Sequence, residues 1–122
     1  MDIGEIDSFC RSRPVEVVVR PSGSQSELVL HGEYDGVGDF FSIHFSDIEY
    51  VDIAGAFVVD GIITDDFRRL CSLESRWQHL VTECSGPAVV FWQSTGQPMP
   101  LRRHYVVVCG TFECKPGSQC KK

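Results

Sequence analysis

Several short segments of this chain alternate between apolar and polar residues, and clusters of turn-forming residues separate them. The valines at odd positions of VEVVVR (15–20) share one face of an extended chain, as do the leucines of ELVLHGEY (27–34). Period-two alternation of this kind predicts β-strands. The links PSGSQS (21–26) and DGVGD (35–39) are short and rich in turn residues. Because short links favour antiparallel neighbours, we expect the first three strands to form a meander.

The third segment, FFSIHFSDIEYVDIAG (40–55), alternates in its first half and then loses its period. Phe41, Ile43 and Phe45 occupy odd positions, whereas Ile48 and Tyr50 occupy even positions and Val51 and Ile53 odd ones again. A slip of one residue moves side chains to the opposite face of a sheet. The chain must therefore bulge or bend at Ser46-Asp47. Since Ser-Asp lacks the glycine of a tight two-residue hairpin, a bulge or bend is favoured over a hairpin.

The middle of the chain predicts one more strand or strand pair and then a helix. AFVVDGII (56–63) is strand-like but interrupted at Asp60-Gly61. Thr64 can cap a helix, with Asp65 and Asp66 in its first turn, where the helix dipole favours anions. Apolar residues then recur at helical spacing. We expect a helix from about 65 to 75, and the pattern of 77–84 does not decide between helix and strand.

The last third of the chain predicts central strands. AVVFWQ (88–93) and RHYVVVCG (103–110) are continuous apolar runs, which are typical of strands covered on both faces. Gly110 marks an expected bulge before a last short strand, TFEC (111–114). The predicted fold class is therefore α+β, with a mostly antiparallel, curved or barrel-like sheet and one short helix. We expect a single domain over 1–122 with a flexible tail at 115–122.

The composition argues against two classes of partner. With 11 Lys and Arg against 17 Asp and Glu, the chain has a net charge of −6 and no basic stripe, so we do not expect nucleic-acid binding. Its apolar runs are too short to span a membrane, and its first residues lack the pattern of a secretory signal. We therefore expect a cytoplasmic protein without a membrane partner, whose acidic surface suits a basic protein partner.

The segment 40–55 also gathers several residues capable of metal binding or acid–base chemistry: His44, Asp47, Glu49 and Asp52. A hairpin at Ser46-Asp47 would place His44 opposite Glu49, yet a metal site would need a third ligand. Asp47 is explained as a turn residue. We interpret the segment mainly as strand architecture.

Other motifs are weaker. His31-x-Glu33 resembles half of the zinc deaminase signature, but the chain has no Cys-x-x-Cys. Gly36-x-Gly38 precedes a strand rather than a helix, which argues against a phosphate loop. Cys109, Cys114 and Cys120 are spaced more widely than most zinc ligands. We expect no cofactor and no metal.

Two functional hypotheses follow. The first is a non-catalytic protein–protein interaction module, by class analogy with small acidic inhibitor or immunity-type proteins. The second is a small-molecule-binding domain or modest enzyme with its pocket at the mouth of the curved sheet. Self-association as a homodimer through an edge strand is compatible with either. The candidate ligand-binding residues for such a site are His44, Glu49, Trp92, His104 and Tyr105.

Overall fold

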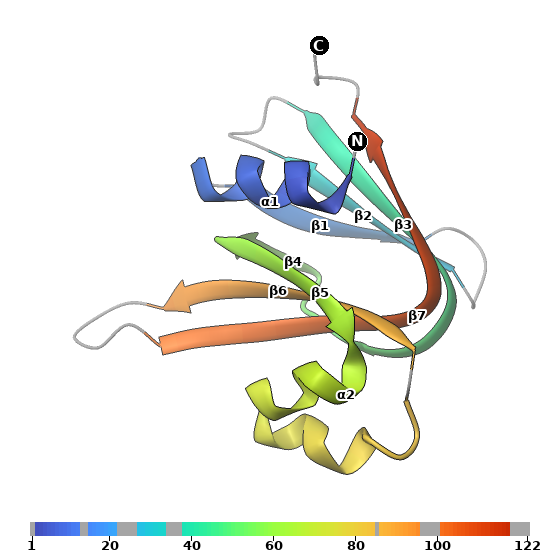
Figure 1. Ribbon diagram of the computed structural model, residues 1–122. Coiled ribbons are helices and arrows are strands. Elements are labelled where there is room, and N and C mark those ends of the chain that lie inside the picture. The colour runs from blue at the N-terminus through green and yellow to red at the C-terminus, as the bar shows by residue number, and fades with distance from the viewer. Residues whose placement is uncertain are drawn as a thin grey trace.

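In the described part of the chain, seven strands form one antiparallel sheet in the order β4-β1-β2-β3-β7-β6-β5 (Figure 1). The structure is a computed structural model, and it describes residues 2–12, 15–21, 27–33, 38–84, 86–95 and 101–117. The strands are β1 (Val15–Pro21), β2 (Glu27–Glu33), β3 (Asp39–Asp52), β4 (Ala56–Val59), β5 (Gly61–Asp66), β6 (Pro87–Thr95) and β7 (Leu101–Pro116). The helical elements are α1 (Ile3–Ser12), α2 (Phe67–Leu70), η1 (Cys71–Leu73) and η2 (Ser75–Leu80).

The sheet curls because its two long central strands bend together. Asp47 of β3 adopts a left-handed backbone conformation (φ 57°) opposite Gly110 of β7. A Cβ atom on Gly110 would lie only 2.9 Å from Asp47 Cβ, so this close approach requires glycine. The β3–β7 register then shifts between Ile48 and Tyr50. The bend predicted at Ser46-Asp47 is therefore confirmed, within one continuous strand.

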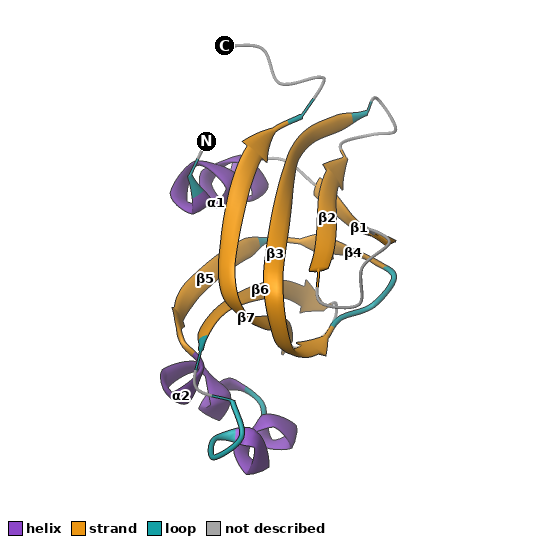
Figure 2. Ribbon diagram, turned by 90° about the vertical axis from the view of Figure 1, so that its right-hand side faces the viewer, coloured by secondary structure: helices purple, strands orange, loops and turns teal. Residues whose placement is uncertain are grey.

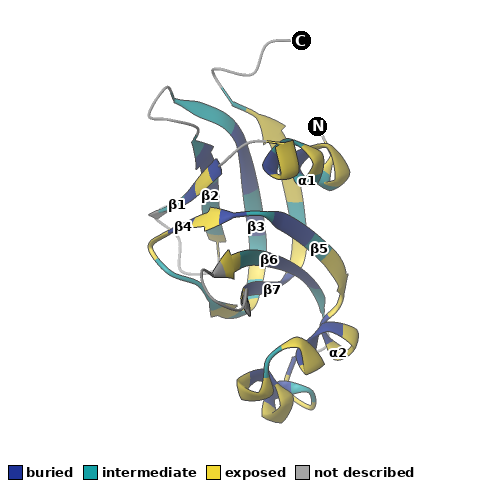
Figure 3. Ribbon diagram, turned by 90° about the vertical axis from the view of Figure 1, so that its left-hand side faces the viewer, coloured by how far each residue is buried: buried dark blue, intermediate teal, exposed yellow. Residues whose placement is uncertain are grey.

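The bend lets the sheet enclose an apolar core. Alternate side chains of β1, β2, β3, β6 and β7 point inward and are almost fully buried. The largest of them include Phe41, Phe45 and Phe91. The ring of Phe57 on β4 lies 4.3 Å from that of Tyr105 on β7, which links the two parts of the curled sheet through the core. In Figure 3 the buried stretches include parts of β6 and the first part of the edge strand β5.

Helix α1 covers part of the open side of the curl. Asp2 Oδ1 accepts a hydrogen bond from the Glu5 backbone N–H (2.8 Å) at the start of the helix, which stabilises its first turn. Ile6 and Cys10 then enter the core. Asp7 Oδ1 accepts a hydrogen bond from the Ile62 backbone N–H (2.7 Å) on the edge strand β5. This contact occupies one of the edge groups that could otherwise pair with another strand.

A second apolar cluster lies on the other side of the sheet, under the helical segment 67–84. Phe67, Trp77 and Leu80 pack there against β6 and β7 residues such as Val90 and Val106. Trp77 is 0% exposed and fills the centre of this contact. The helical segment therefore covers the outside of β6 and the first half of β7.

The predicted fold class is confirmed, with some differences in detail. The strand pair interrupted at Asp60-Gly61 is present as β4 and β5. The prediction of Thr64, Asp65 and Asp66 as a helix start was wrong, because β5 continues to Asp66 and the helix begins at Phe67. Residues 75–80 continue as 3₁₀ helix. Here, pairing of β5 with β6 outweighs the local preference for a helix cap.

Two further differences lie at the chain ends. Helix α1 was not predicted, although Ile3, Ile6 and Cys10 follow a helical spacing. Strand β7 includes Lys115 and Pro116, which the sequence assigned to the tail. Residues 118–122 lie outside the described residues.

Candidate functional site

The five candidate ligand-binding residues lie in different places in the structure. His44 is on the outside of β3, Glu49 is exposed beside the β3 register shift, and Tyr105 points into the core. Trp92 and His104 are neighbours across the β6–β7 pair. Because His104 and Tyr105 point to opposite faces of one strand, they do not line one cavity. Of the five, the sheet pairing brings only Trp92 and His104 together.

His104 is part of a polar network that attaches the helical segment to the sheet. Its Nδ1 lies 2.9 Å from Glu74 Oε2, and its carbonyl oxygen accepts a hydrogen bond from Arg76 Nη2 (2.8 Å). Arg76 also donates to Glu74 and, through Nε, to Asp52 Oδ2 (2.7 Å). The Trp77 indole N–H donates to the same Asp52 oxygen (2.6 Å). These contacts explain Asp52, Glu74 and His104 as structural residues.

Trp92 is likewise explained by packing. Its indole lies over Gly61 of β5, where a Cβ atom would approach the ring to 2.4 Å. The Arg11 guanidinium of α1 lies 5.6 Å from the centre of the Trp92 ring, within the range of a cation–π contact. Asp60, which lies between β4 and β5, contacts the end of β6 nearby. Its Oδ2 accepts a hydrogen bond from the Ser94 backbone N–H (2.7 Å). Trp92 therefore helps to join α1, β5 and β6.

A different part of the sheet carries polar groups on a side that no described helix covers. Figure 2 looks onto β2, β3 and β7, and no described helix crosses in front of them. We call this side the outer face; it includes β4, β1, β2, the first half of β3 and the last part of β7. Its side chains alternate with core residues and are Ala56, Val58, Glu16, Val18, Glu27, Val29, His31, Glu33, Ser42, His44, Ser46, Thr111, Glu113 and Lys115.

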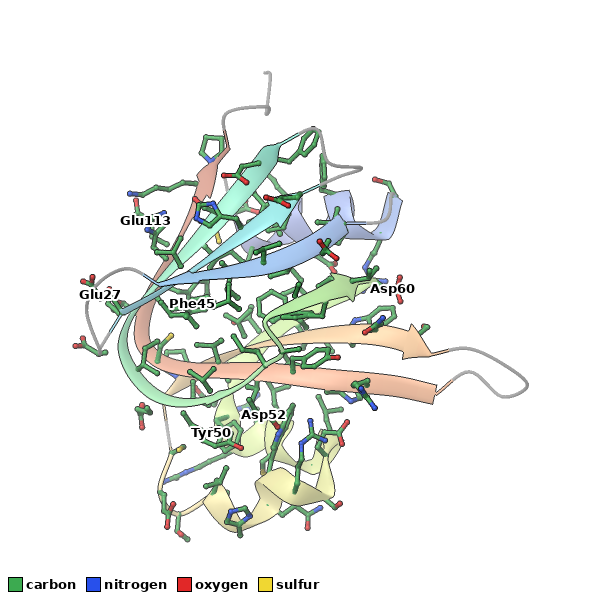
Figure 4. The ribbon with its side chains drawn as sticks, turned by 180° about the vertical axis from the view of Figure 1, so that it is seen from behind. Glu27, Phe45, Tyr50, Asp52, Asp60 and Glu113 are labelled. Carbon is green, nitrogen blue, oxygen red and sulfur yellow. The ribbon has the colours of Figure 1, made fainter. Side chains whose placement is uncertain are left out.

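The outer face has an apolar part and an acidic part. Val18 lies beside Ala56 across the β1–β4 pair, and Val58 of β4 is 37% exposed. Among the described side chains of this face, four glutamates (Glu16, Glu27, Glu33 and Glu113) stand against one lysine, Lys115. Figure 4 shows Glu27 and Glu113 projecting from this side, away from the helical segment. The described side chains of the face therefore carry a net negative charge, and the exposed Val58 lies beside them.

His44 lies near the middle of the outer face. Its Nε2 lies 3.1 Å from Ser42 Oγ, and in the strand register it stands between Val29 of β2 and Glu113 of β7. A hollow of about 160 Å³ adjoins it, lined also by Glu27, Ser46 and Lys115. Partial burial, followed by the Lys115 charge, lowers the pKa of His44 below 6.5.

His31 lies on the neighbouring strand, opposite Ser42. Its Nδ1 is 3.0 Å from Asp39 Oδ2, although the two atoms are not aligned as a hydrogen bond. The prediction that a hairpin could place His44 opposite Glu49 does not apply, because β3 is continuous through both residues. No group of three or more His, Cys, Asp or Glu side chains within the described ranges converges to hold a metal ion.

Of the three cysteines considered as ligands, the structure describes Cys109 and Cys114. Cys109 is in the core, Cys114 is partly buried against it, and Cys120 lies outside the described residues. Burial raises the pKa of Cys109 to about 11, and burial together with Asp7 and Asp60 raises that of Cys10 to about 12. Both thiols therefore stay protonated near neutral pH and are poor nucleophiles or ligands.

Sequence reasoning missed the outer face as a unit. Its acidic residues come from three strands, and only the sheet register brings them to one side. No helix in the described part is long and apolar enough to cross a membrane. No protein-family model, no curated protein and no solved structure matches this chain.

Proposed function

We propose that this protein is a non-catalytic interaction module that docks a partner protein with a basic surface on the outer face. The observation that supports this most is that the outer face combines the half-buried Val18 of β1 and the exposed Ala56 and Val58 of β4 with four glutamates, and that no described helix lies over it. The outside of β6 and of the first half of β7, by comparison, is already covered by the helical segment.

The composition of the outer face resembles that of protein interfaces. Such interfaces have an apolar centre and a polar rim, and their charges steer the partner and select it. Here Val18, Ala56 and Val58 form the apolar part, and Glu16 and Glu33 lie beside it across the β1–β2 pair. The net charge of −6 favours association with a basic surface. An inhibitor or immunity-type role, in which binding itself neutralises the partner, needs only such a surface.

The small-molecule alternative has less support. Tyr105 belongs to the core, and His104 and Trp77 belong to the contact between the helical segment and the sheet. The hollow beside His44 has about 160 Å³, whereas pockets for drug-sized ligands usually hold roughly 300–1,000 Å³. A face that binds a protein therefore agrees better with the geometry than a pocket for a small ligand.

The experiment uses a decalysine peptide as a stand-in for a basic surface. Backbone amide NMR signals of the protein are followed during titration at low ionic strength, where exposed charges are least screened. The proposal expects the largest shifts in β1, β2 and the end of β7. The substitutions Glu16→Gln and Glu113→Gln should weaken binding, whereas Glu83→Gln, an exposed change in the helical segment, should not. Shifts confined to the helical segment, or equal effects of all three substitutions, would contradict the proposal.

A further inference from the structure

His44 is a titratable group near the middle of the outer face, where glutamates outnumber lysines among the described side chains. Neighbouring strands flank it on both sides, and its side chain is partly buried. Its Nε2 contacts the Ser42 hydroxyl. A hydroxyl can donate a hydrogen bond to the nitrogen of a neutral imidazole, and it can accept one from the N–H of a protonated imidazole. His44 therefore gains a proton without losing this partner.

Charged and polar groups surround His44 on all three strands of this part of the face. They are Glu27 and His31 on β2, Ser42 and Ser46 on β3, and Glu113 and Lys115 on β7. The carboxylates of Glu27 and Glu113 favour the protonated imidazole, while burial, Lys115 and His31 oppose it, and the opposing effects are larger. At neutral pH the imidazole is consequently uncharged and the carboxylates set the charge of the face.

We propose that His44 makes docking on the outer face pH-dependent, so that a basic partner binds while His44 is neutral and is released when His44 is protonated. This inference rests on the proposed function. A proton on His44 places a positive charge close to Glu27 and Glu113 and cancels part of their attraction for cationic groups. A docked partner also removes water from the imidazole, which disfavours the charged form further. Partner and proton therefore compete for the same face.

The test measures decalysine binding between about pH 7.5 and about pH 5.5, because lysine side chains (pKa about 10.4) stay charged throughout this range. Any change in affinity then comes from the protein. A unit charge at about 4 Å in water predicts that the affinity of the wild-type protein weakens at the lower pH by up to about fivefold, the value for full protonation of His44. His44→Asn should retain most of its affinity at the lower pH, and His44→Lys should bind weakly at both pH values.

His79→Asn is the matched control, since His79 is an exposed histidine on η2 outside the outer face. It should keep the wild-type pH dependence, and amide NMR spectra of all variants check that the fold is retained. The inference is overturned if His44→Asn weakens with pH as much as the wild type does, or if the wild type binds equally at both pH values. Absence of outer-face binding near pH 7.5 would instead contradict the proposed function itself, so the two failures are distinguishable.

Discussion

Asp52 gives the sharpest test of how the helical segment is held on the sheet. Its Oδ2 accepts hydrogen bonds from two groups of η2, the Trp77 indole N–H (2.6 Å) and Arg76 Nε (2.7 Å). Trp77 is 0% exposed, so its indole has no access to solvent in the native structure. Figure 4 shows Asp52 on the side of the sheet that faces this segment. The substitution Asp52→Ala removes the acceptor and leaves the donors in place.

The expected loss has two parts. A buried donor left without an acceptor costs about 1–3 kcal/mol. The ion pair with Arg76 adds less than about 1 kcal/mol, because the Arg76 side chain is 46% exposed and solvent screens the pair. Asp52→Ala should therefore lower the free energy of unfolding by about 1–4 kcal/mol. For a chain of this size, that lowers Tm by roughly 3–20 °C.

Urea unfolding followed by circular dichroism measures this loss, and Trp77→Phe provides the comparison. The phenyl ring keeps much of the apolar contact but donates no hydrogen bond. In that background, Asp52→Ala should cost only the ion-pair part, below about 1 kcal/mol. Glu83→Ala, an exposed change in the turn after η2, should leave stability nearly unchanged. The reasoning is refuted if Asp52→Ala costs less than about 0.5 kcal/mol, or costs the same with Phe at position 77.

The remaining predictions concern the bend, the thiols and the pH dependence of stability. Gly110→Val should destabilise the fold by more than about 1 kcal/mol, since its side chain would collide with Asp47, and chemical denaturation measures the loss. Cys10 should react slowly with a thiol reagent near pH 8 in the native protein and rapidly after unfolding, because its pKa of about 12 keeps it protonated; equal rates would contradict this. The pKa of His44 lies below 6.5 in the folded protein, so the unfolded chain takes up a proton first as the pH falls. Stability should therefore decrease as the pH falls below about 6.5, and His44→Asn should reduce that slope.

Local patterns in the sequence predicted much of the sheet, because the first strands alternate between apolar and polar residues and the last two are continuous apolar runs. The bend was also predictable, since a change from odd to even apolar positions requires it. The end of β5 was not, because Thr64, Asp65 and Asp66 suit a helix start as well as a strand. There the pairing with β6 decides the outcome. Helix α1 carried a signal in Asp2, Glu5, Ile6 and Cys10 that strand-oriented reasoning overlooked.

The candidate site was less predictable than the fold. His44 was identified from its own segment, and the structure places it on an accessible face. Its relation to Glu113 and Lys115 depends on pairing between strands about 70 residues apart along the chain, which local patterns do not encode. Trp92, His104 and Tyr105 are explained by structural contacts because aromatic and imidazole groups serve cores and polar networks as readily as they bind ligands.

Capture of a partner from the native host tests the central claim most directly. The wild-type protein, a Val58→Glu variant of the outer face and a Glu83→Gln variant of the helical segment serve as parallel baits. The proposed function predicts one basic protein bound in stoichiometric amount by the wild type and by Glu83→Gln, and lost with Val58→Glu. A partner that all three retain equally, or that only Glu83→Gln loses, would show that docking does not use the outer face.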